Sequence, residues 1–169
     1  MKKRLTGICV AILAAGCAGK MPMSAEEFRQ MAPGAFRVQV DTFEVKRSLR
    51  QVGDTWRRRA PACLNVTIRT TSSAPGSYQV IDTAYKPTVI VGAQRVELHL
   101  QQKHLKGVLN VYKEPPEGRY IFVADADAVD RGTTKVHIIG PKGYEVVVRA
   151  IKAWAEGSSQ GCPDLTKIG

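Results

Sequence analysis

The string that comes closest to a catalytic motif is Gly157–Gly161, which reads Gly-x-Ser-x-Gly. In hydrolases that use this string, the serine nucleophile stands on a sharp turn between a strand and a helix. Here a predicted helix precedes the string, and no histidine follows Ser159 to act as its base. We therefore do not predict hydrolase activity from this string.

The three histidines, His99, His104 and His137, lack the spacing of metal ligands. His99 and His137 fall on the outward-facing positions of predicted strands, and His104 falls in a predicted turn. We expect all three to be solvated surface side chains and predict no metal site and no cofactor.

The segment Asp125–Asp130 begins like a calcium-binding loop, with aspartates at alternate positions. Val129 stands where such a loop needs an oxygen ligand, and no acidic residue closes it. We expect a solvated turn between two strands, with a weak cation site as the alternative.

The N-terminus has the organisation of a secretory signal peptide. Three cations, Lys2, Lys3 and Arg4, precede the uncharged stretch Leu5–Ala15. That stretch is shorter than the roughly 20 residues that a membrane-spanning helix needs. We expect residues 1–16 to be removed and the mature chain to contain no integral membrane helix.

The segment Leu13–Cys17 is similar to the lipobox of bacterial lipoproteins. The resemblance covers the first 20 residues and implies that the Cys17 thiol carries lipid, palmitate included, and becomes the new amino terminus. Ala18, rather than aspartate, follows Cys17, which in that family implies sorting to the periplasmic face of the outer membrane. Ordinary secretion after an Ala-x-Ala-like site is the alternative.

Removal of residues 1–16 takes away three cations and leaves a formal charge of +7. Nucleic acid would be the default partner of a cytosolic chain with this charge. Because we expect this chain to be exported, we predict no nucleic-acid partner. The expected partners are the membrane itself, through the lipid, and an envelope protein, an anionic lipid or an anionic glycan.

Two cysteines, Cys63 and Cys162, remain in the folded part of the mature chain. Export to an oxidising compartment favours one disulfide between them, with two buried thiols as the alternative. Neither lies in a Cys-x-x-Cys motif, so we expect a structural bridge and no redox role.

Helical periodicity begins at Glu44, because Val45, Leu49, Val52 and Trp56 are spaced four, three and four apart. The pattern predicts an amphipathic helix over residues 44–60, ended by Pro61. Its opposite face is either merely solvated or a site for an anionic partner, and the candidate residues are Lys46, Arg47, Arg50, Arg57, Arg58 and Arg59.

The other elements are mostly strands. A short helix over residues 25–31 and a strand over residues 36–40 precede the first amphipathic helix, and a second amphipathic helix runs from Tyr144 to Ala155 and ends at Gly157. Between the two amphipathic helices, alternating residues predict the strands 64–69, 78–85, 88–91, 95–101, 108–113, 119–126 and 133–139, with a loop over residues 70–76 and a turn at residues 103–107.

This order predicts an α+β fold, with a curved antiparallel sheet of about six to seven strands and two amphipathic helices on one face. It is similar, in element order, to the helix-grip domains of some envelope lipoproteins and lipid-binding proteins. We divide the chain into a signal peptide (1–16), a lipid anchor and tether (17–35) and a single globular domain (36–169).

No acid, base and nucleophile converge in the sequence, so we predict no enzyme. The main hypothesis is a non-enzymatic interaction or structural module of the cell envelope, tethered to the outer membrane. The alternatives are a carrier of a hydrophobic or lipid ligand between sheet and helix, and an envelope enzyme of unrecognised type.

Overall fold

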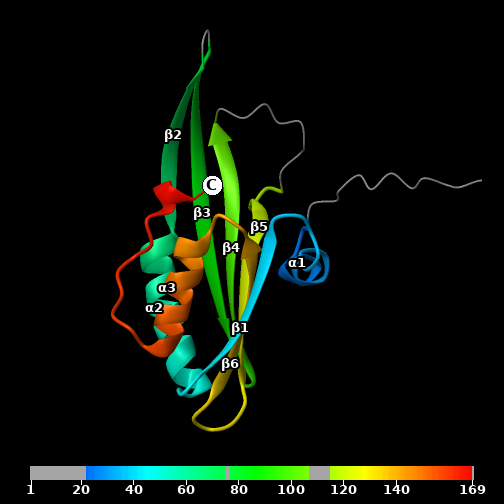
Figure 1. The fold of residues 1–169 in the computed structure, drawn as a ribbon, viewed down its shortest axis with the longest axis vertical. Helices are drawn as coiled ribbons and strands as arrows, with labels where there is room; N and C mark the ends of the chain where they lie inside the picture. Colours follow the sequence, from blue (N-terminus) through cyan, green and yellow to red (C-terminus); the bar gives the residue numbers. More distant parts are fainter. Residues whose placement is uncertain (1–21, 75–76, 107–114, 169) are drawn as a thin grey trace, which may run out of the picture.

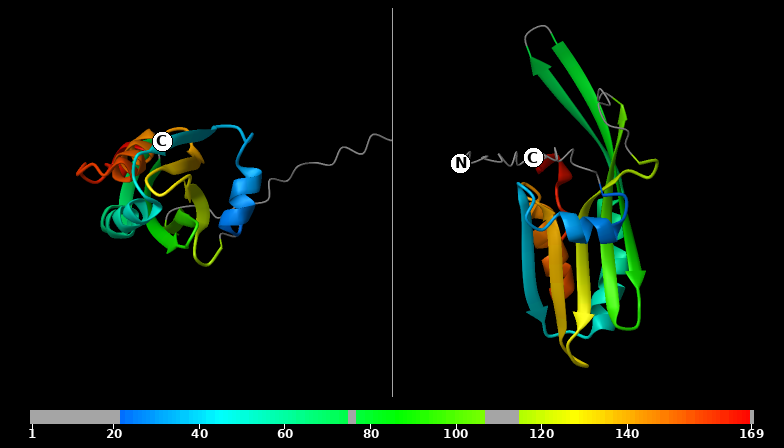
Figure 2. Two further views of the ribbon diagram at one scale, coloured as in Figure 1. Left: turned by 90° about the horizontal axis from the view of Figure 1, so that it is seen from below. Right: turned by 90° about the vertical axis from the view of Figure 1, so that its right-hand side faces the viewer.

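The computed structural model describes residues 22–74, 77–106 and 115–168, which form one antiparallel sheet and three α-helices (Figure 1). The strand order is β1-β6-β5-β4-β3-β2. Helices α2 and α3 cover one face of the sheet and α1 lies on the other (Figure 2). The predicted α+β class, with a helix-grip-like order, is confirmed. The elements are α1 (Ala25–Met31), β1 (Val38–Val45), α2 (Leu49–Leu64), β2 (Val66–Ala74), β3 (Ser77–Val91), β4 (Arg95–Lys106), β5 (Arg119–Ala128), β6 (Thr134–Pro141), α3 (Glu145–Glu156) and a 3₁₀ turn (Leu165–Lys167).

Strands β2 and β3 form a long hairpin that projects beyond the helices (Figures 1 and 2). The loop predicted over residues 70–76 is wrong, because β2 continues to Ala74. The two strands predicted over 78–85 and 88–91 are one continuous strand. Pro87 fits within it because it lies beyond Tyr85, the last residue of β3 that pairs with β2.

Strand β4 also extends further than its sequence indicates. The turn predicted at residues 103–107 is wrong, because the long β3 offers partners up to Lys106. His104 is therefore a strand residue, opposite Thr83, and its Nδ1 lies 3.2 Å from the Thr83 hydroxyl. The strand expected over 108–113 lies outside the described residues.

Helix α2 begins and ends later than predicted. Val45 closes β1, and Ser48 caps the helix with a reciprocal pair of hydrogen bonds: Gln51 N donates to Ser48 Oγ at 3.4 Å, and Ser48 N donates to Gln51 Oε1 at 3.0 Å. The predicted stop at Pro61 is wrong. Pro61 lies in the last turn, where its missing N–H removes a single intrahelical bond and the helix continues to Leu64.

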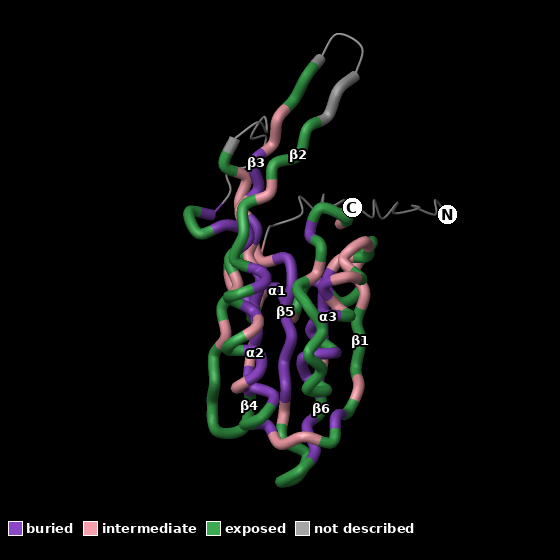
Figure 3. The backbone as a smooth tube through the Cα atoms, turned by 90° about the vertical axis from the view of Figure 1, so that its left-hand side faces the viewer, coloured by how far each residue is buried: buried purple, intermediate pink, exposed green. Residues whose placement is uncertain are grey.

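The main core fills the space between the sheet and the two helices. Trp56 of α2, Trp154 of α3 and Phe122 of β5 are fully buried in it. The Trp56 indole donates to the carbonyl of Ile151, which joins the two helices. In Figure 3, the central strand β5 is buried along most of its length, whereas the edge strand β1 is mostly exposed or half-buried. Large aromatic side chains therefore occupy the region where the sequence hypothesis placed a carried ligand.

Helix α3 has almost the predicted bounds. Tyr144 precedes it, and Gly157, with φ of +85°, ends it in a left-handed cap. The Gly157 N–H donates to the Trp154 carbonyl. Across residues 22–74, 77–106 and 115–168, no helix has the length and apolar character needed to cross a membrane.

Helix α1 packs against the sheet face opposite α2 and α3. Ser24 caps it by accepting a hydrogen bond from Glu27 N at 3.1 Å. Phe28 is buried against Val123 and Ile139 in a second, smaller core. The described part of the expected tether is therefore partly ordered on the sheet.

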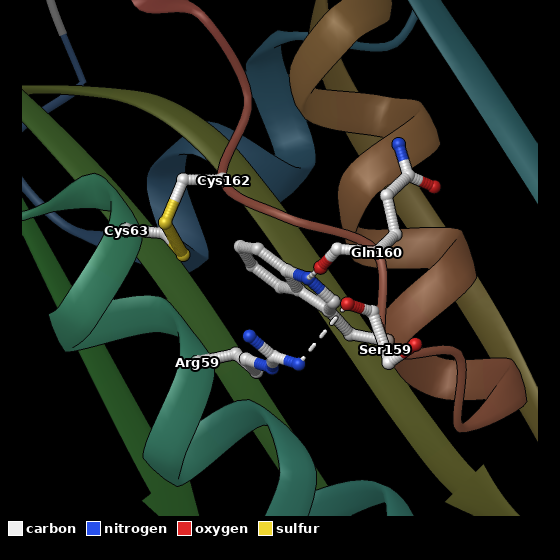
Figure 4. Close-up of a disulfide and its surroundings, with 6 residues drawn as sticks. Arg59, Cys63, Ser159, Gln160 and Cys162 are labelled. Carbon is white, nitrogen blue, oxygen red and sulfur yellow. Dashed lines mark hydrogen bonds between the residues drawn. A yellow bond between two sulfur atoms is a disulfide. The ribbon is translucent and has the colours of Figure 1, made fainter.

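A disulfide joins Cys63, in the last turn of α2, to Cys162, in the tail after α3 (Figure 4). Two hydrogen bonds hold the same tail: Arg59 donates to the Ser159 carbonyl at 3.3 Å, and the Trp154 indole donates to the Gln160 carbonyl at 3.4 Å. Together these contacts fasten the C-terminal tail to both helices.

Candidate functional site

Strands β5 and β6 separate at one end of the sheet. Their pairing begins at Val123 and Ile139, while the last residue of β6, Pro141, pairs with β1 instead. On its other side β5 pairs with β4, with a register shift after Leu100. The residues of β5 before Val123 therefore turn away from β6.

Gly140 permits this separation. A Cβ atom on Gly140 would lie 2.2 Å from the ring of Phe122, far inside van der Waals contact. The fully buried Phe122 ring takes the space that a side chain on β6 would fill. Glycine at this position is thus part of the local packing.

A pocket of about 370 Å³ lies where the two strands part. Its size is within the ordinary range of small-molecule sites. Most of its exposed lining is apolar and comes from α1, the start of β1 and β5, and the end of β6. The lining residues are Pro22, Phe28, Val38, Gln102, Arg119, Tyr120, Ile121, Pro141 and Tyr144.

The polar edge of the pocket is a chain of three side chains. Arg119 donates to Gln102 Oε1 at 2.9 and 3.3 Å, and Gln102 Nε2 donates to the Tyr85 hydroxyl at 3.5 Å. Burial, followed by interaction with Tyr144, raises the pKa of Tyr85, so its hydroxyl stays protonated at neutral pH. This edge offers donors and no nucleophile.

Arg119 carries a charge that no described carboxylate neutralises, because its hydrogen bonds go to the neutral Gln102. It is half-buried, so water screens the charge only in part. A guanidinium beside an apolar pocket is suited to hold a carboxylate or phosphate group.

An ionic cluster holds α1, and with it the Phe28 wall of the pocket, on the sheet. Arg29 donates to both carboxylate oxygens of Asp125, at 2.8 and 2.7 Å, and also to Glu97. His99 Nε2 lies 2.9 Å from Glu97 Oε2. Burial opposes ionisation of Glu97, but hydrogen bonds from Arg29 and His99 outweigh it and lower the pKa of Glu97.

This cluster corrects two sequence predictions. His99 does point away from the main core, as predicted, but it is buried, because α1 covers that face. Strand β5 continues to Ala128 and Asp125 is buried within it, so the solvated turn predicted over Asp125–Asp130 is wrong for residues 125–128. His137 is a partly exposed outward residue, as predicted, and its Nδ1 lies 2.8 Å from the Thr42 hydroxyl; His104 is half-buried as well. Within the described ranges, no group of acidic, histidine or cysteine side chains could hold a metal ion.

The six candidate cations on the first amphipathic helix do not form one binding face. Lys46 and Arg47 precede α2, and Arg47 donates to the carbonyls of Trp154 and Ala155 at the end of α3. Arg59 holds the C-terminal tail. The remaining three arginines, Arg50, Arg57 and Arg58, are exposed. Arg50 and Arg57 form ion pairs with Asp54.

The Gly157–Gly161 string is a helix cap followed by a tail loop, and a helix rather than a strand precedes it, as predicted. Sequence reasoning missed the pocket, because its walls come from five separate segments. The one available signal was Arg119, a cation directly after the Pro-Pro-Glu-Gly turn.

Neither a family model nor a curated protein sequence matches this chain. Among solved structures, a START superfamily protein from Mycobacterium smegmatis is similar, with 15% sequence identity and a TM-score of 0.33. The match covers 71% of this chain and 94% of that protein. The fold class given above rests on the strand order and helix positions of this chain itself.

Proposed function

We propose that this chain is a lipoprotein of the bacterial outer membrane that binds an amphipathic anion, a fatty acid or a similar single-chain lipid, in the pocket between β5 and β6. The observation that carries the proposal is the guanidinium of Arg119, which no described carboxylate neutralises, at the edge of an apolar pocket. An apolar tail would lie against Phe28, Val38 and Ile121, and an anionic head would lie at Arg119.

The proposed anchor fits this site in position. Pro22 lines the pocket and follows Cys17, the proposed lipidation site, by only five residues. Five fully extended residues span at most about 18 Å. Lipid on Cys17 would therefore keep the pocket close to the bilayer, from which a lipid ligand could be taken.

The ligand site differs in place from the one in the sequence hypothesis. Aromatic side chains fill the space between the sheet and α2 and α3, whereas the pocket lies at the end of the sheet. Non-enzymatic binding is the activity that these residues support, since the pocket edge presents hydrogen-bond donors and a cation, but no activated nucleophile or base.

Displacement of a fluorescent fatty acid tests the proposal. Residues 18–169, which contain every described element of the fold, are stripped of bound lipid and titrated with dansyl-undecanoic acid, and laurate is then used as competitor. We expect Arg119→Gln to weaken laurate binding about tenfold or more, as loss of a charge-assisted hydrogen bond does. Neutral dodecanol should bind both forms alike.

Two further variants separate the site from the fold. Val38→Trp should block the pocket, because it adds an indole to a half-buried lining position. Arg58→Gln removes a cation from the exposed surface of α2 and should leave laurate binding unchanged. Equal laurate binding by the Arg119→Gln, Val38→Trp and unaltered proteins would refute the proposed site.

A further inference from the structure

The loop between α1 and β1 (Pro33–Arg37, the α1–β1 loop) exposes the most solvated large apolar side chain of the described residues. Phe36 is 94% exposed, and all five residues of the loop are exposed. A phenylalanine in full contact with water contributes nothing to the core and loses the free energy that burial would supply. An isolated exposed side chain would need no explanation, but this one has a fixed position and charged neighbours.

The backbone holds Phe36 outward. Ala35 N donates to the Ala32 carbonyl at 2.9 Å, and Val38 N donates to the Ala35 carbonyl at 3.2 Å. Arg37 takes the left-handed conformation, with φ of +65°, which side-chain-bearing residues seldom adopt. Its carbonyl accepts a hydrogen bond from Lys142 N at 2.7 Å, so the loop is fastened to the end of β6.

That fastening places the backbone of Lys142 next to that of Arg37, which follows Phe36 in the chain. The side chains of Arg37 and Lys142 are both exposed, and neither forms an ion pair with a described carboxylate. An exposed aromatic ring on a loop that also carries exposed cations is the combination that partitions into the headgroup region of an anionic bilayer.

We propose that the α1–β1 loop is a membrane-docking surface, with Phe36 inserted among the lipid headgroups and Arg37 and Lys142 against their phosphates. Figure 2 shows α1 and this loop on the side of the sheet opposite α2 and α3. The basic residues of α2 would then face away from the bilayer. The mature charge of +7 supplies long-range attraction in addition.

Docking in this way goes beyond ligand binding but would serve it. Val38, a pocket residue, lies two positions after Phe36 and pairs with Pro141, directly before Lys142. The docked loop would thus hold the end of the sheet that carries the pocket against the membrane.

Sedimentation with vesicles tests the proposal without the lipid anchor. Residues 18–169 are mixed with vesicles of phosphatidylglycerol and phosphatidylethanolamine in equal parts. We expect Phe36→Ser to weaken partitioning about tenfold and the Arg37→Gln, Lys142→Gln pair to weaken it more than tenfold. Binding should fall steeply with salt, because the Debye length shortens to about 8 Å at physiological ionic strength.

The matched control removes two charges from the opposite side, through Arg57→Gln with Arg58→Gln. It should change partitioning less than about threefold, since only the long-range attraction is reduced. A loss equal to that of the loop pair would show that net charge alone acts and would overturn the proposal, as would unchanged partitioning of Phe36→Ser or no vesicle binding by the unaltered domain.

A direct readout uses Phe36→Trp. The two native tryptophans, Trp56 and Trp154, are fully buried, so the new indole alone would change its emission on docking. We expect a blue shift with vesicles and quenching by brominated lipid; emission that stays at its aqueous wavelength on bound vesicles would refute insertion of the loop. Laurate binding by Phe36→Ser should remain normal, so failure of this proposal is distinguishable from failure of the ligand site.

Discussion

Removal of the disulfide should cost this fold a large part of its stability. The perturbation is Cys63→Ser together with Cys162→Ser, so that no single thiol is left to form other bridges. The two residues are 99 positions apart. The loop-closure estimate for a cross-link of this length is about 4.7 kcal/mol, and native disulfides of small exported domains typically contribute about 2–5 kcal/mol.

The structure favours a value inside that range rather than below it. Between Ser158 and the bridge, three described hydrogen bonds join the tail to the helices: Ser158 N donates to the Ala153 carbonyl, and Arg59 and Trp154 donate to tail carbonyls. After the bridge, Leu165 is buried in the main core. The tail therefore has few contacts of its own with which to resist release. Loss of the bridge should loosen this segment and the end of α3 before the central strands.

Urea denaturation of the oxidised domain and of the double serine variant measures the effect. We expect the free energy of unfolding to fall by about 2–5 kcal/mol, with hydrogen exchange rising first at residues 158–168. A fall below about 1 kcal/mol would contradict the stabilising role. Two free thiols in the oxidised, denatured protein, detected by thiol-reactive mass tagging, would refute the bridge itself.

Four further perturbations test other features of the protein. Gly140→Ala should destabilise the fold by about 1–3 kcal/mol in urea, because the new methyl group would overlap the phenylalanine ring of β5; an unchanged midpoint would contradict that packing. Arg29→Met should cost about 1.5–3 kcal/mol by leaving Asp125 buried without its cation, and a neutral result would refute the ionic attachment of α1. Because the pKa of Glu97 is lowered in the fold, its contribution to the free energy of unfolding is complete at neutral pH. That contribution is lost as the pH falls from about 4.3, the ordinary glutamate pKa, through the lowered pKa. The acid unfolding midpoint of the domain should therefore shift when Glu97→Gln is introduced. Labelled palmitate should enter the unaltered protein but not Cys17→Ser in the producing cell, and continued labelling of the serine variant would refute lipidation at that residue.

The order of elements could be predicted from hydrophobic periodicity, but their bounds could not. Val45 fits the helical spacing of Leu49, Val52 and Trp56, yet it also fits the inward alternation of β1, and it is buried in the same core in either case. The capping box at Ser48 decides between the two periods. Pro61 misled because its lost hydrogen bond and ring clash disfavour a continued helix, whereas burial of Cys63 and Leu64 in the main core favours one more turn.

The sequence could not predict what covers the outer face of the sheet. Alternation along β4 correctly assigned His99 to the face away from the main core, but the burial of that face depends on α1, which is only seven residues long. The signal was present as a buried stripe of Ala25, Phe28 and Ala32, spaced three and four apart. Nothing in the spacing indicated that Arg29, between them, bonds to Asp125.

The pocket could be predicted still less. It depends on a register shift of β5 and on the parting of two strands, neither of which has a sequence pattern of its own. Arg119 and Val38 are 81 positions apart and come together only because β1 lies next to β6 in the sheet. A site built from such non-local pairing is visible only once the strand order is known.

Paramagnetic broadening of methyl signals tests ligand binding in the pocket most directly. Residues 18–169, labelled at isoleucine and valine methyl groups, are titrated with stearate that carries a doxyl nitroxide near the end of its chain, with unlabelled stearate as the reference. We predict that the signals of Val38 and Ile121 lose most of their intensity, while those of Val52 and Ile151, in the filled core under α2 and α3, keep theirs. Broadening centred on Val52 and Ile151, or uniform weak broadening with no site, would contradict the proposed function.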